Sequence, residues 1–371
     1  MNSCPCLELE TLRRYALARS LFAPTTLPQA LARLGFVQAD PLRAPARAQD
    51  LILYQRVRHY RAGQLEQHYP RLAVAEDFFV NYGFVVPQLQ ALMHPRQPRK
   101  VWSAEHAALA QEVLAHVQHA GSAHPKDVDA ALQHGRVSNW FGGSSRLSTE
   151  LLDALHYRGA LRVVRRDAGT RVYAPAPPWP GVAEPQQAMD QLLDAVVALY
   201  APLTRRSLGQ LLSHLGGGAP QWEHLRSATL KRALQRLPSA EVAGQQWFWP
   251  VGEAPRALAR RWRGAQRVRL LAPFDPVVWD RQRFELFWGW AYRFEAYTPA
   301  AQRQRGHYAL PLLWGEEVIG WGNLRVQDGR LHAQLGYVSG QAPRTPGYAA
   351  ALQQELAGMA VFLGATSIAT C

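Results

Sequence analysis

The chain has 371 residues, 48% of them hydrophobic, and it carries 41 Lys and Arg against 28 Asp and Glu, for a formal net charge of +13. This composition excludes a largely disordered chain, and the length suffices for two to four domains. The basic excess favours a polyanion as partner, although only Lys100, Lys126 and Lys231 are lysines, and such arginine usage also fits solubility charge in a GC-rich genome.

The cysteines and the N-terminal residues indicate the cellular compartment in which the protein is expected. The three cysteines, Cys4, Cys6 and Cys371, contain no Cys-x-x-Cys pair and are not an even set that disulfide bonds could pair within a domain. This usage of cysteine favours a reducing environment. The start lacks a basic segment followed by an apolar core, and no run of 18 or more apolar residues occurs. We therefore expect a cytoplasmic, nucleoid-associated protein without a membrane partner.

Residues 1–122 are expected to form a helical or winged-helix domain with one short extended segment. A helix capped by a threonine is predicted to end at Gly35. Pro41 then biases the residue before it toward an extended conformation, and a second helix follows. Gln38 and Asp40 are thus predicted to lie on an extended segment between two helices.

Residues 123–175 are expected to form a winged-helix module. A leucine-rich helix is predicted to stop at Gly159 and to be followed by a basic hairpin, LRVVRR-DAGT-RVYAP. A helix followed by a basic hairpin is typical of this DNA-binding motif. The candidate DNA contacts of the module are Arg146, Arg162, Arg165 and Arg166.

The same order recurs after a proline-rich linker at 174–185. Three helices and a short hairpin are predicted over 186–255, which indicates tandem winged-helix modules. The rest of the chain alternates apolar and polar residues around a turn signal at Asp328-Gly329. The predicted fold class is therefore α+β, with tandem winged-helix modules and, over 266–371, a small antiparallel β-barrel closed by a final helix.

Cofactor motifs are absent from the sequence. It contains no glycine-rich dinucleotide loop, no phosphate-binding loop with its lysine and no His-Glu-x-x-His zinc motif. His116 and His119 stand three apart on a predicted helix, but without a nearby acidic or Cys ligand they fit a solvated pair better than a metal site. The glycines at 216–218 are interpreted as a flexible turn that ends a helix. We expect no cofactor and no metal.

The C-terminal third is rich in aromatic residues and holds acids that could act in catalysis. Its tryptophans, with Tyr292 and Tyr297, could stack on nucleobases or form the core of a small barrel, and the core is favoured. Asp275, Asp280 and Glu285 could be catalytic, but Asp-Pro is a common turn opener and structural roles are favoured for them.

The triplet Gln38-Ala39-Asp40 carries the candidate catalytic residues. Side chains two residues apart on an extended chain point to the same side, so a carboxamide and a carboxylate would lie together. Arg43 and Arg47 follow closely and are candidate DNA contacts. A salt bridge between Asp40 and these arginines is the structural alternative.

On these residues the chain resembles the winged-helix crosslink-repair DNA glycosylases, the YcaQ-like family related to AlkZ. Three stretches carry the resemblance: GFVQADPLRAPARAQDLILYQRVRHY at 35–60, LLAPFDPVVWDRQRFELFWGWAYRFEAYTP at 270–299 and YALPLLWGEEVIGW at 308–321. The match extends over nearly the whole chain. Ala39 departs from it, because the family more often has a bulkier aliphatic residue there, and this affects the expected shape of the pocket.

The resemblance implies a C-shaped channel formed by the winged-helix modules and a catalytic Gln-x-Asp motif at Gln38 and Asp40. The implied activity is removal of 7-alkylated guanine from double-stranded DNA, including guanine in interstrand crosslinks. Alkylation at N7 makes guanine cationic, so that the base leaves without a general acid. Asp40, ionised near its ordinary pKa, would stabilise the sugar cation and accept a proton from water, and Gln38 would orient the water or the sugar-phosphate.

Three classes of protein remain open from the residues alone. With only three lysines, an enzyme that forms a Schiff base and cleaves the strand is disfavoured, and a monomeric, monofunctional glycosylase is expected. A non-enzymatic winged-helix transcriptional regulator would need only the basic modules and not Asp40. A scaffold would bind protein through the aromatic C-terminal domain. The family resemblance favours the enzyme.

Overall fold

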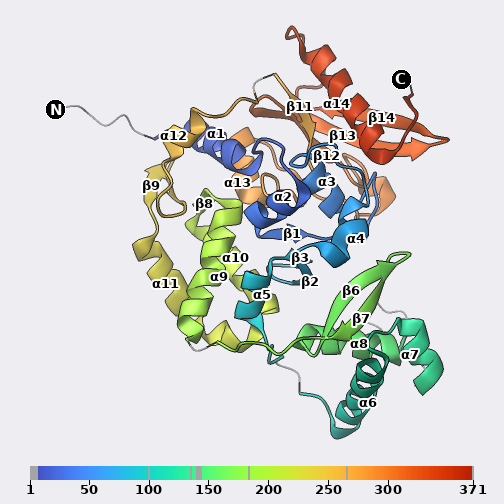
Figure 1. Ribbon diagram of the computed structural model, residues 1–371. Helices are drawn as coiled ribbons and strands as arrows, with labels where there is room; N and C mark the ends of the chain where they lie inside the picture. Colours follow the sequence, from blue (N-terminus) through green and yellow to red (C-terminus); the bar gives the residue numbers. More distant parts are fainter. Residues whose placement is uncertain are drawn as a thin grey trace. The chain divides into compact units, whose positions relative to one another are not determined.

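The computed structural model describes residues 7–98, 101–133, 136–138, 144–182, 184–264 and 266–369. The predictions about Cys4, Cys6 and Cys371 lie outside these residues. The chain divides into two compact units (Figure 1). Unit 1 comprises Met1–Leu65, Leu193–Leu211 and Leu230–Cys371, and unit 2 comprises Glu66–Leu192 and Leu212–Thr229.

Unit 1 contains the N-terminal helices, a C-terminal sheet and the last helix of the chain (Figure 1). Its helices are α1 (Leu9–Ser20), α2 (Leu27–Leu34), α3 (Ala48–Tyr54), α12 (Pro255–Ala259), α13 (Arg281–Trp288) and α14 (Tyr348–Leu363), with a short 3-10 helix η3 (Ala300–Gln302). Its strands are β1 (Phe36–Gln38), β8 (Leu203–Thr204), β9 (Ser239–Val242), β10 (Gln245–Phe248), β11 (Val268–Leu270), β12 (Leu310–Trp314), β13 (Glu317–Gln327), β14 (Arg330–Tyr337) and β15 (Ser367–Ile368). Four helices contribute residues to both units: α4 (Gln64–His68), α9 (Pro185–Tyr200), α10 (Arg205–Gly218) and α11 (Arg226–Arg236).

The C-terminal sheet has the strand order β11-β12-β13-β14-β15 and curls into half of a barrel. Strands β11 to β14 pair antiparallel, as the sequence predicts, and β13 turns into β14 at Asp328-Gly329. Strand β15 pairs with β14 in parallel. The sequence did not predict this last strand, because two residues are too few to show an alternation.

The segment that carries the candidate catalytic residues follows the prediction. Helix α2 ends at Gly35, which has a φ of 70°, and β1 follows it directly. All three residues of β1 are buried, and α3 begins ten residues after the strand ends. Gln38 and Asp40 therefore lie where a buried strand passes into a loop that leads to the next helix.

The core of unit 1 joins α1 to the C-terminal part of the chain. Its buried members are Leu17, Leu21, Leu271, Val277, Val278, Phe284, Trp290, Tyr292, Leu313 and Val318. The prediction that the C-terminal aromatic residues form a core is confirmed for Trp290 and Tyr292. Tyr297 is an exception, with 81% of its surface exposed.

A buried ion pair fixes the loop between β11 and α13. The carboxylate of Asp275 accepts hydrogen bonds from the two terminal guanidinium nitrogens of Arg56, at 2.7 and 2.9 Å, and both side chains are fully buried. The backbone carbonyl of Asp275 accepts from the N–H of Trp279 at 2.8 Å, and Asp280 caps α13 by accepting from the N–H of Arg283. Structural roles for Asp275 and Asp280 are thus confirmed.

Unit 2 contains a short hairpin and a group of helices followed by a longer hairpin. Its elements are η1 (Tyr69–Arg71), β2 (Ala75–Phe78), β3 (Tyr82–Val85), α5 (Pro87–Met93), α6 (Ala104–Ala120), α7 (Pro125–Leu132), β4 (Arg136–Ser138), β5 (Ser144–Arg146), α8 (Leu147–Arg158), β6 (Leu161–Asp167), β7 (Thr170–Pro175) and η2 (Pro220–Leu225). The β2–β3 hairpin corrects the expectation of a single extended piece in the first hundred residues. Its acids Glu76 and Asp77 are both 1% exposed, so the strand lacks the usual alternation of apolar and polar residues.

The order of elements in unit 2 agrees with the predicted module. Helices α7 and α8 precede the antiparallel hairpin β6–β7, and Ala123 forms an additional antiparallel bridge to Tyr173 of that hairpin. In unit 1 the second predicted hairpin, β9–β10, forms a sheet of order β8-β10-β9.

The glycines at 216–218 form the last turn of α10 and not the flexible turn that the sequence suggested. A Cβ atom on Gly218 would lie 2.7 Å from the backbone oxygen of Phe79, and this close approach requires glycine. Among the helices that the structure describes, none is long and apolar enough to cross a membrane.

Candidate active site

Asp40 is partly buried at the start of the loop that follows β1. Its Oδ1 accepts a hydrogen bond from the backbone N–H of Leu42 at 2.8 Å. Its own N–H donates to the side-chain oxygen of the buried Gln49 at 3.4 Å. Burial raises the pKa of Asp40, and the hydrogen bond from Leu42 acts in the opposite direction. The expectation of an ordinary pKa is therefore corrected: the carboxylate is held in surroundings that disfavour its charge.

Arg43 and Arg47 lie near a different carboxylate. Burial raises the pKa of Asp50 in α3, and Arg47 and Arg43 are among the groups that act to lower it. Asp50 accepts hydrogen bonds from the hydroxyl of Tyr60 at 2.8 Å and from the N–H of Gly63 at 3.0 Å. Among the described residues no cation forms an ion pair with Asp40, so its charge is not neutralised by the neighbouring arginines.

Gln38 is 4% exposed and is oriented by Trp279. The indole N–H of Trp279 donates to Oε1 of Gln38 at 2.9 Å. Because an indole can only donate, the atom it contacts must be the amide oxygen, and this fixes which way the amide points. No residue in the described part of the chain accepts a hydrogen bond from the amide nitrogen. Gln38 therefore offers its amide N–H donors to a ligand.

Two tyrosines complete the site, of which the sequence analysis identified only Tyr297, as a residue that could stack on nucleobases. Tyr308 is 2% exposed, and its buried hydroxyl has no hydrogen-bond partner among the described residues. Burial raises the pKa of Tyr308 well above 10, and the nearby charge of Asp40 raises it further. The ring of Phe294 contacts both Tyr308, at a centroid distance of 5.2 Å, and the exposed Tyr297, at 6.1 Å. An aromatic wall thus stands beside Asp40.

The candidate DNA contacts in unit 2 fall into two groups. Arg162 and Arg165 are exposed, and Arg165 forms a surface pair with Asp167 at 3.1 Å. Arg146 is also largely exposed and pairs with Asp129. Surface pairs of this kind contribute little to stability, so Arg146 and Arg165 can exchange their carboxylate partners for a DNA phosphate.

Arg166 differs from the other arginines of the hairpin. Its guanidinium donates to both carboxylate oxygens of Glu76, at 2.7 and 2.5 Å, and the side chain of Glu76 is fully buried. It also donates to the backbone oxygen of Gly169 at 2.8 Å. The charge of Arg166 is therefore neutralised by Glu76 inside unit 2, and this pairing disfavours the predicted contact of Arg166 with DNA.

Comparisons with known proteins bear on this site. A family model described as DNA glycosylase AlkZ-like matches residues 31–362, which include Gln38, Asp40, Trp279 and Tyr308. Among solved structures, the chain is similar to the DNA glycosylase AlkZ of Streptomyces sahachiroi, with 15% sequence identity and a TM-score of 0.62. The match covers 98% of this chain and 99% of that chain. At this level of identity the structural likeness concerns the fold, and it agrees with the mixed α+β architecture.

Proposed function

The chain belongs to the AlkZ-like DNA glycosylase family, and we propose that it hydrolyses the N-glycosidic bond of cationic 7-alkylguanine in double-stranded DNA, including guanine that bridges the two strands. One observation carries this proposal. Asp40 is a partly buried carboxylate that no described cation neutralises, and it follows closely on a glutamine whose amide nitrogen is held ready to donate. This arrangement suits a reaction in which positive charge develops on a sugar and water attacks it.

The proposed mechanism needs only these two side chains. The cationic base leaves as a neutral molecule, and the deoxyribose becomes an oxocarbenium ion that the charge of Asp40 stabilises. The N–H of Leu42 occupies Oδ1 of Asp40, so that Oδ2 can accept the proton of the attacking water. The amide nitrogen of Gln38 donates to the oxygen of that water or to a sugar-phosphate oxygen and thereby orients it.

Hydrolysis without strand cleavage is part of the proposal. A strand-cleaving glycosylase commonly forms a Schiff base with an amine. Lys126 and Lys231 are exposed residues of α7 and α11, and Lys100 lies outside the described residues. Neither described lysine hydrogen-bonds to Gln38 or Asp40. We therefore propose a monofunctional enzyme that leaves an abasic site.

We also interpret two groups of elements as winged-helix modules. One consists of α6, α7 and α8 with the β6–β7 hairpin, and the other consists of α9, α10 and α11 with β8 and the β9–β10 hairpin. A guanine tethered to the opposite strand cannot be flipped freely into a closed pocket. The proposed substrate therefore calls for an open channel lined by such modules. We further propose that the protein acts as a monomer in the cytoplasm, in association with the nucleoid.

The direct test uses duplex DNA that contains a single 7-methylguanine. The purified protein is incubated with the duplex, and heat or alkali then converts abasic sites into strand breaks. We expect breaks at the methylated guanine only after this treatment. Breaks that form without heat or alkali would contradict the monofunctional mechanism, and no breaks above the spontaneous background would contradict the proposed function.

Base release is expected to fall in acid as Asp40 takes up a proton. Because burial raises its pKa, the fall should be centred above the ordinary aspartate value of 3.8. The measurement is the single-turnover rate over a pH series at saturating protein, after subtraction of spontaneous depurination. A rate that stays constant down to the ordinary pKa would show that the ionised form of Asp40 is not required.

Trp279→Phe is expected to slow base release by about threefold to tenfold while DNA affinity stays the same, because one hydrogen bond that orients Gln38 is lost. The ring contact of Trp279 with Tyr200, at 5.1 Å, is compatible with phenylalanine. Trp288→Phe is the matched control, since its indole also donates one hydrogen bond, to the backbone oxygen of Glu316 at 2.9 Å. If base release slows by the same factor in both variants, Trp279 stabilises the fold and has no specific role in orienting Gln38.

Replacing Arg162 and Arg165 together with alanine should weaken binding to every duplex alike. Each lost phosphate contact lowers the slope of log affinity against log salt concentration by roughly 0.9. Arg166→Ala should instead leave the buried Glu76 with only the hydroxyl of Tyr82 and the more distant Arg171, at 3.7 Å, and destabilise the fold by about 1 to 3 kcal/mol. Salt titrations of DNA binding and chemical denaturation separate the two effects. An unchanged slope in the double variant would show that this hairpin does not contact DNA.

A further inference from the structure

A polar cavity of about 400 Å³ lies next to the loop that carries Asp40. It extends from Ala44 of that loop, past Tyr308, to strands β13 and β14. The lining consists of Ala44, Gln304, Arg305, Gly306, His307, Tyr308, Asn323, Leu324 and Gln334. It contains hydrogen-bond donors of several kinds and no carboxylate, so it suits an acceptor-rich or anionic group.

Arg305 contributes a guanidinium group to this cavity, and no described residue accepts from the N–H groups of that guanidinium at hydrogen-bond distance. Its guanidinium lies 5.0 Å from the ring centre of Trp290 and 5.7 Å from that of Trp321, and its side chain is 17% exposed. The nearest carboxylate, Glu295, is 4.0 Å away, which is beyond hydrogen-bond distance. No residue that the structure describes accepts a hydrogen bond from the guanidinium. The guanidinium nitrogens, which pair with Glu295 only at this distance, can therefore donate to a ligand in the cavity.

The backbone around Arg305 is held in place. Glu295 accepts hydrogen bonds from the N–H groups of Arg305, at 2.8 Å, and Gly306, at 3.2 Å, and the side-chain nitrogen of Asn323 donates to the carbonyl of Arg305 at 2.6 Å. Gly306 has a φ of 121°, and a Cβ atom there would lie 2.4 Å from Asn323. The cavity is thus a pre-formed site, and it is lined on the side of Asp40 by Tyr308, whose buried hydroxyl has no described partner.

We propose that this cavity is a phosphate subsite that binds the DNA phosphate flanking the target nucleotide. The proposal rests on the proposed function, because it assigns the neighbouring Asp40 to the sugar of that nucleotide. A planar guanidinium and a hydroxyl can together satisfy two or three oxygens of a phosphodiester. Anchored in this way, the sugar would stay against Asp40 while the base departs, whatever the size of the adduct.

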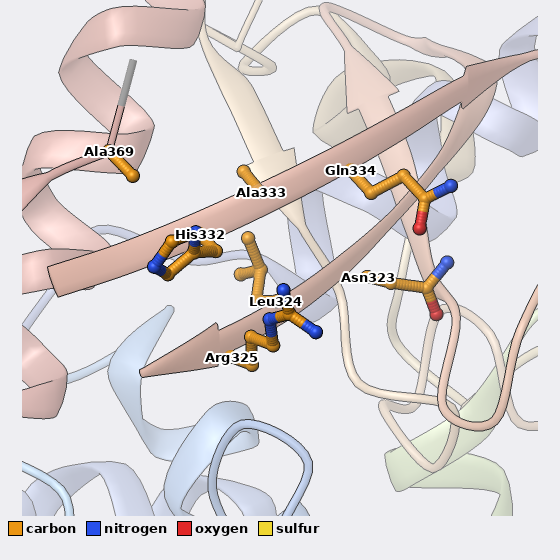
Figure 2. A pocket seen from close by; sticks show the side chains of 7 residues that line it. All are labelled: Asn323, Leu324, Arg325, His332, Ala333, Gln334 and Ala369. Carbon is orange, nitrogen blue, oxygen red and sulfur yellow. The ribbon is translucent and has the colours of Figure 1, made fainter. Parts of the chain in front are cut away.

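A second hollow continues the first along the sheet. Figure 2 shows its lining residues Asn323, Leu324, Arg325, His332, Ala333, Gln334 and Ala369 on β13, β14 and the chain end, around a volume of about 330 Å³. Three of these residues also line the first cavity. In the strand register Asn323 lies opposite Gln334 and Arg325 opposite His332, so that the two pairs share one face of the hairpin. This second hollow also lacks a carboxylate and offers a path for the next phosphate of the same strand.

The test replaces single phosphates of the DNA by neutral methylphosphonates. A set of duplexes carries one 7-methylguanine and one methylphosphonate at each nearby linkage in turn, and both affinity and excision are measured for the wild type and Arg305→Gln. At one linkage beside the lesion the methylphosphonate should lower wild-type affinity and kcat/KM about tenfold or more, the loss typical of one charged hydrogen bond. In Arg305→Gln the same methylphosphonate should lower affinity and kcat/KM no further, since the protein partner of that phosphate is already absent.

Arg344→Gln is the matched control, because it removes an exposed arginine of the same unit that lies outside both cavities. Tyr308→Phe should show the same coupling at the same linkage, and it tests the proposal if Arg305→Gln fails to fold. If the methylphosphonates affect wild type and both cavity variants equally at every linkage, the proposal is wrong. If the wild type binds DNA but releases no base, the proposed function fails while the affinity data still decide on the subsite.

Inorganic phosphate serves as a further probe, at an ionic strength matched with chloride. It should raise the melting temperature of the DNA-free protein little, since a single free anion makes only part of the contacts of a DNA strand. Stabilisation by inorganic phosphate that depends on Arg305, without coupling to any methylphosphonate, would identify a site for the free anion and overturn the assignment to DNA.

Discussion

Asp40→Asn is expected to reduce base release by about a thousandfold or more while DNA affinity stays within a few-fold of the wild type. The carboxylate supplies negative charge to the developing sugar cation and accepts the proton of water, and asparagine can do neither. Asparagine has nearly the same shape and can still accept the hydrogen bond from Leu42. The loss should therefore appear in single-turnover excision and not in equilibrium binding.

The folded state should tolerate this substitution. Because burial raises the pKa of Asp40, folding favours its protonated form, and the stability that Asp40 contributes is lost as pH rises through its folded-state pKa. At neutral pH the ionised side chain is therefore a cost to folding that Asp40→Asn removes. Thermal melting at neutral pH should give a melting temperature equal to or above that of the wild type.

Asp50→Asn is the matched control for this experiment. The chemical change is the same, but Asp50 is 5% exposed and accepts hydrogen bonds from Tyr60 and Gly63. Asparagine can keep both bonds through its single side-chain oxygen, so this substitution should change stability little and leave the chemical step intact. Gln38→Ala should cost less than Asp40→Ala, since orientation is lost and not charge. Equal losses of DNA affinity and base release in Asp40→Asn would show that Asp40 anchors the substrate, and the proposed role would then be wrong.

The sequence locates Gln38 and Asp40 because both lie in one short segment. Their elements follow from local signals: a helix stop at Gly35 and a proline that keeps the chain extended. Trp279 could not be found in this way, since it stands 241 positions from Gln38 and only the folded chain brings its indole to the amide. Tyr308 stands two residues before a strand that is buried on both faces, and nothing local shows that its hydroxyl lacks a partner.

The sequence alone also does not show which arginines of the β6–β7 hairpin are available to DNA. Arg165 and Arg166 are adjacent and chemically identical, so composition counts both toward a basic surface. Strand alternation predicts that only one of them faces away from the unit, but it does not say which. The answer depends on Glu76, which is 90 positions earlier in the chain and lies in a hairpin that the sequence did not predict. Net charge therefore overstates the number of arginines that can reach DNA.

The second large effect concerns the leaving group. Cationic 7-alkylguanine should be excised, whereas uracil and 8-oxoguanine in the same duplex should remain at the spontaneous background. A neutral base leaves as an anion unless an acid protonates it, and neither side chain of the proposed mechanism is an acid. Parallel assays with the three lesions, at one protein concentration and one sequence context, measure this selectivity. Bulky 7-alkyl adducts should be accepted about as readily as methyl, because phosphate and sugar contacts hold the nucleotide and no pocket closes around the base.

Rapid excision of uracil would contradict this mechanism and would require an acid close to the base. Two buried carboxyl groups of unit 1, those of Asp50 and Asp275, differ in their fitness for that role. Asp50 accepts from Tyr60 and Gly63, and Asp275 is held by both arms of Arg56 as a fully buried ion pair. As a protonated acid Asp275 could not keep both bonds from Arg56, whereas both bonds to Asp50 are accepted by Oδ1 and are compatible with a proton on Oδ2. Excision of cationic 7-alkylguanine without excision of uracil would show that Asp50 does not act as this acid, and that the positive charge that drives departure already resides on the base.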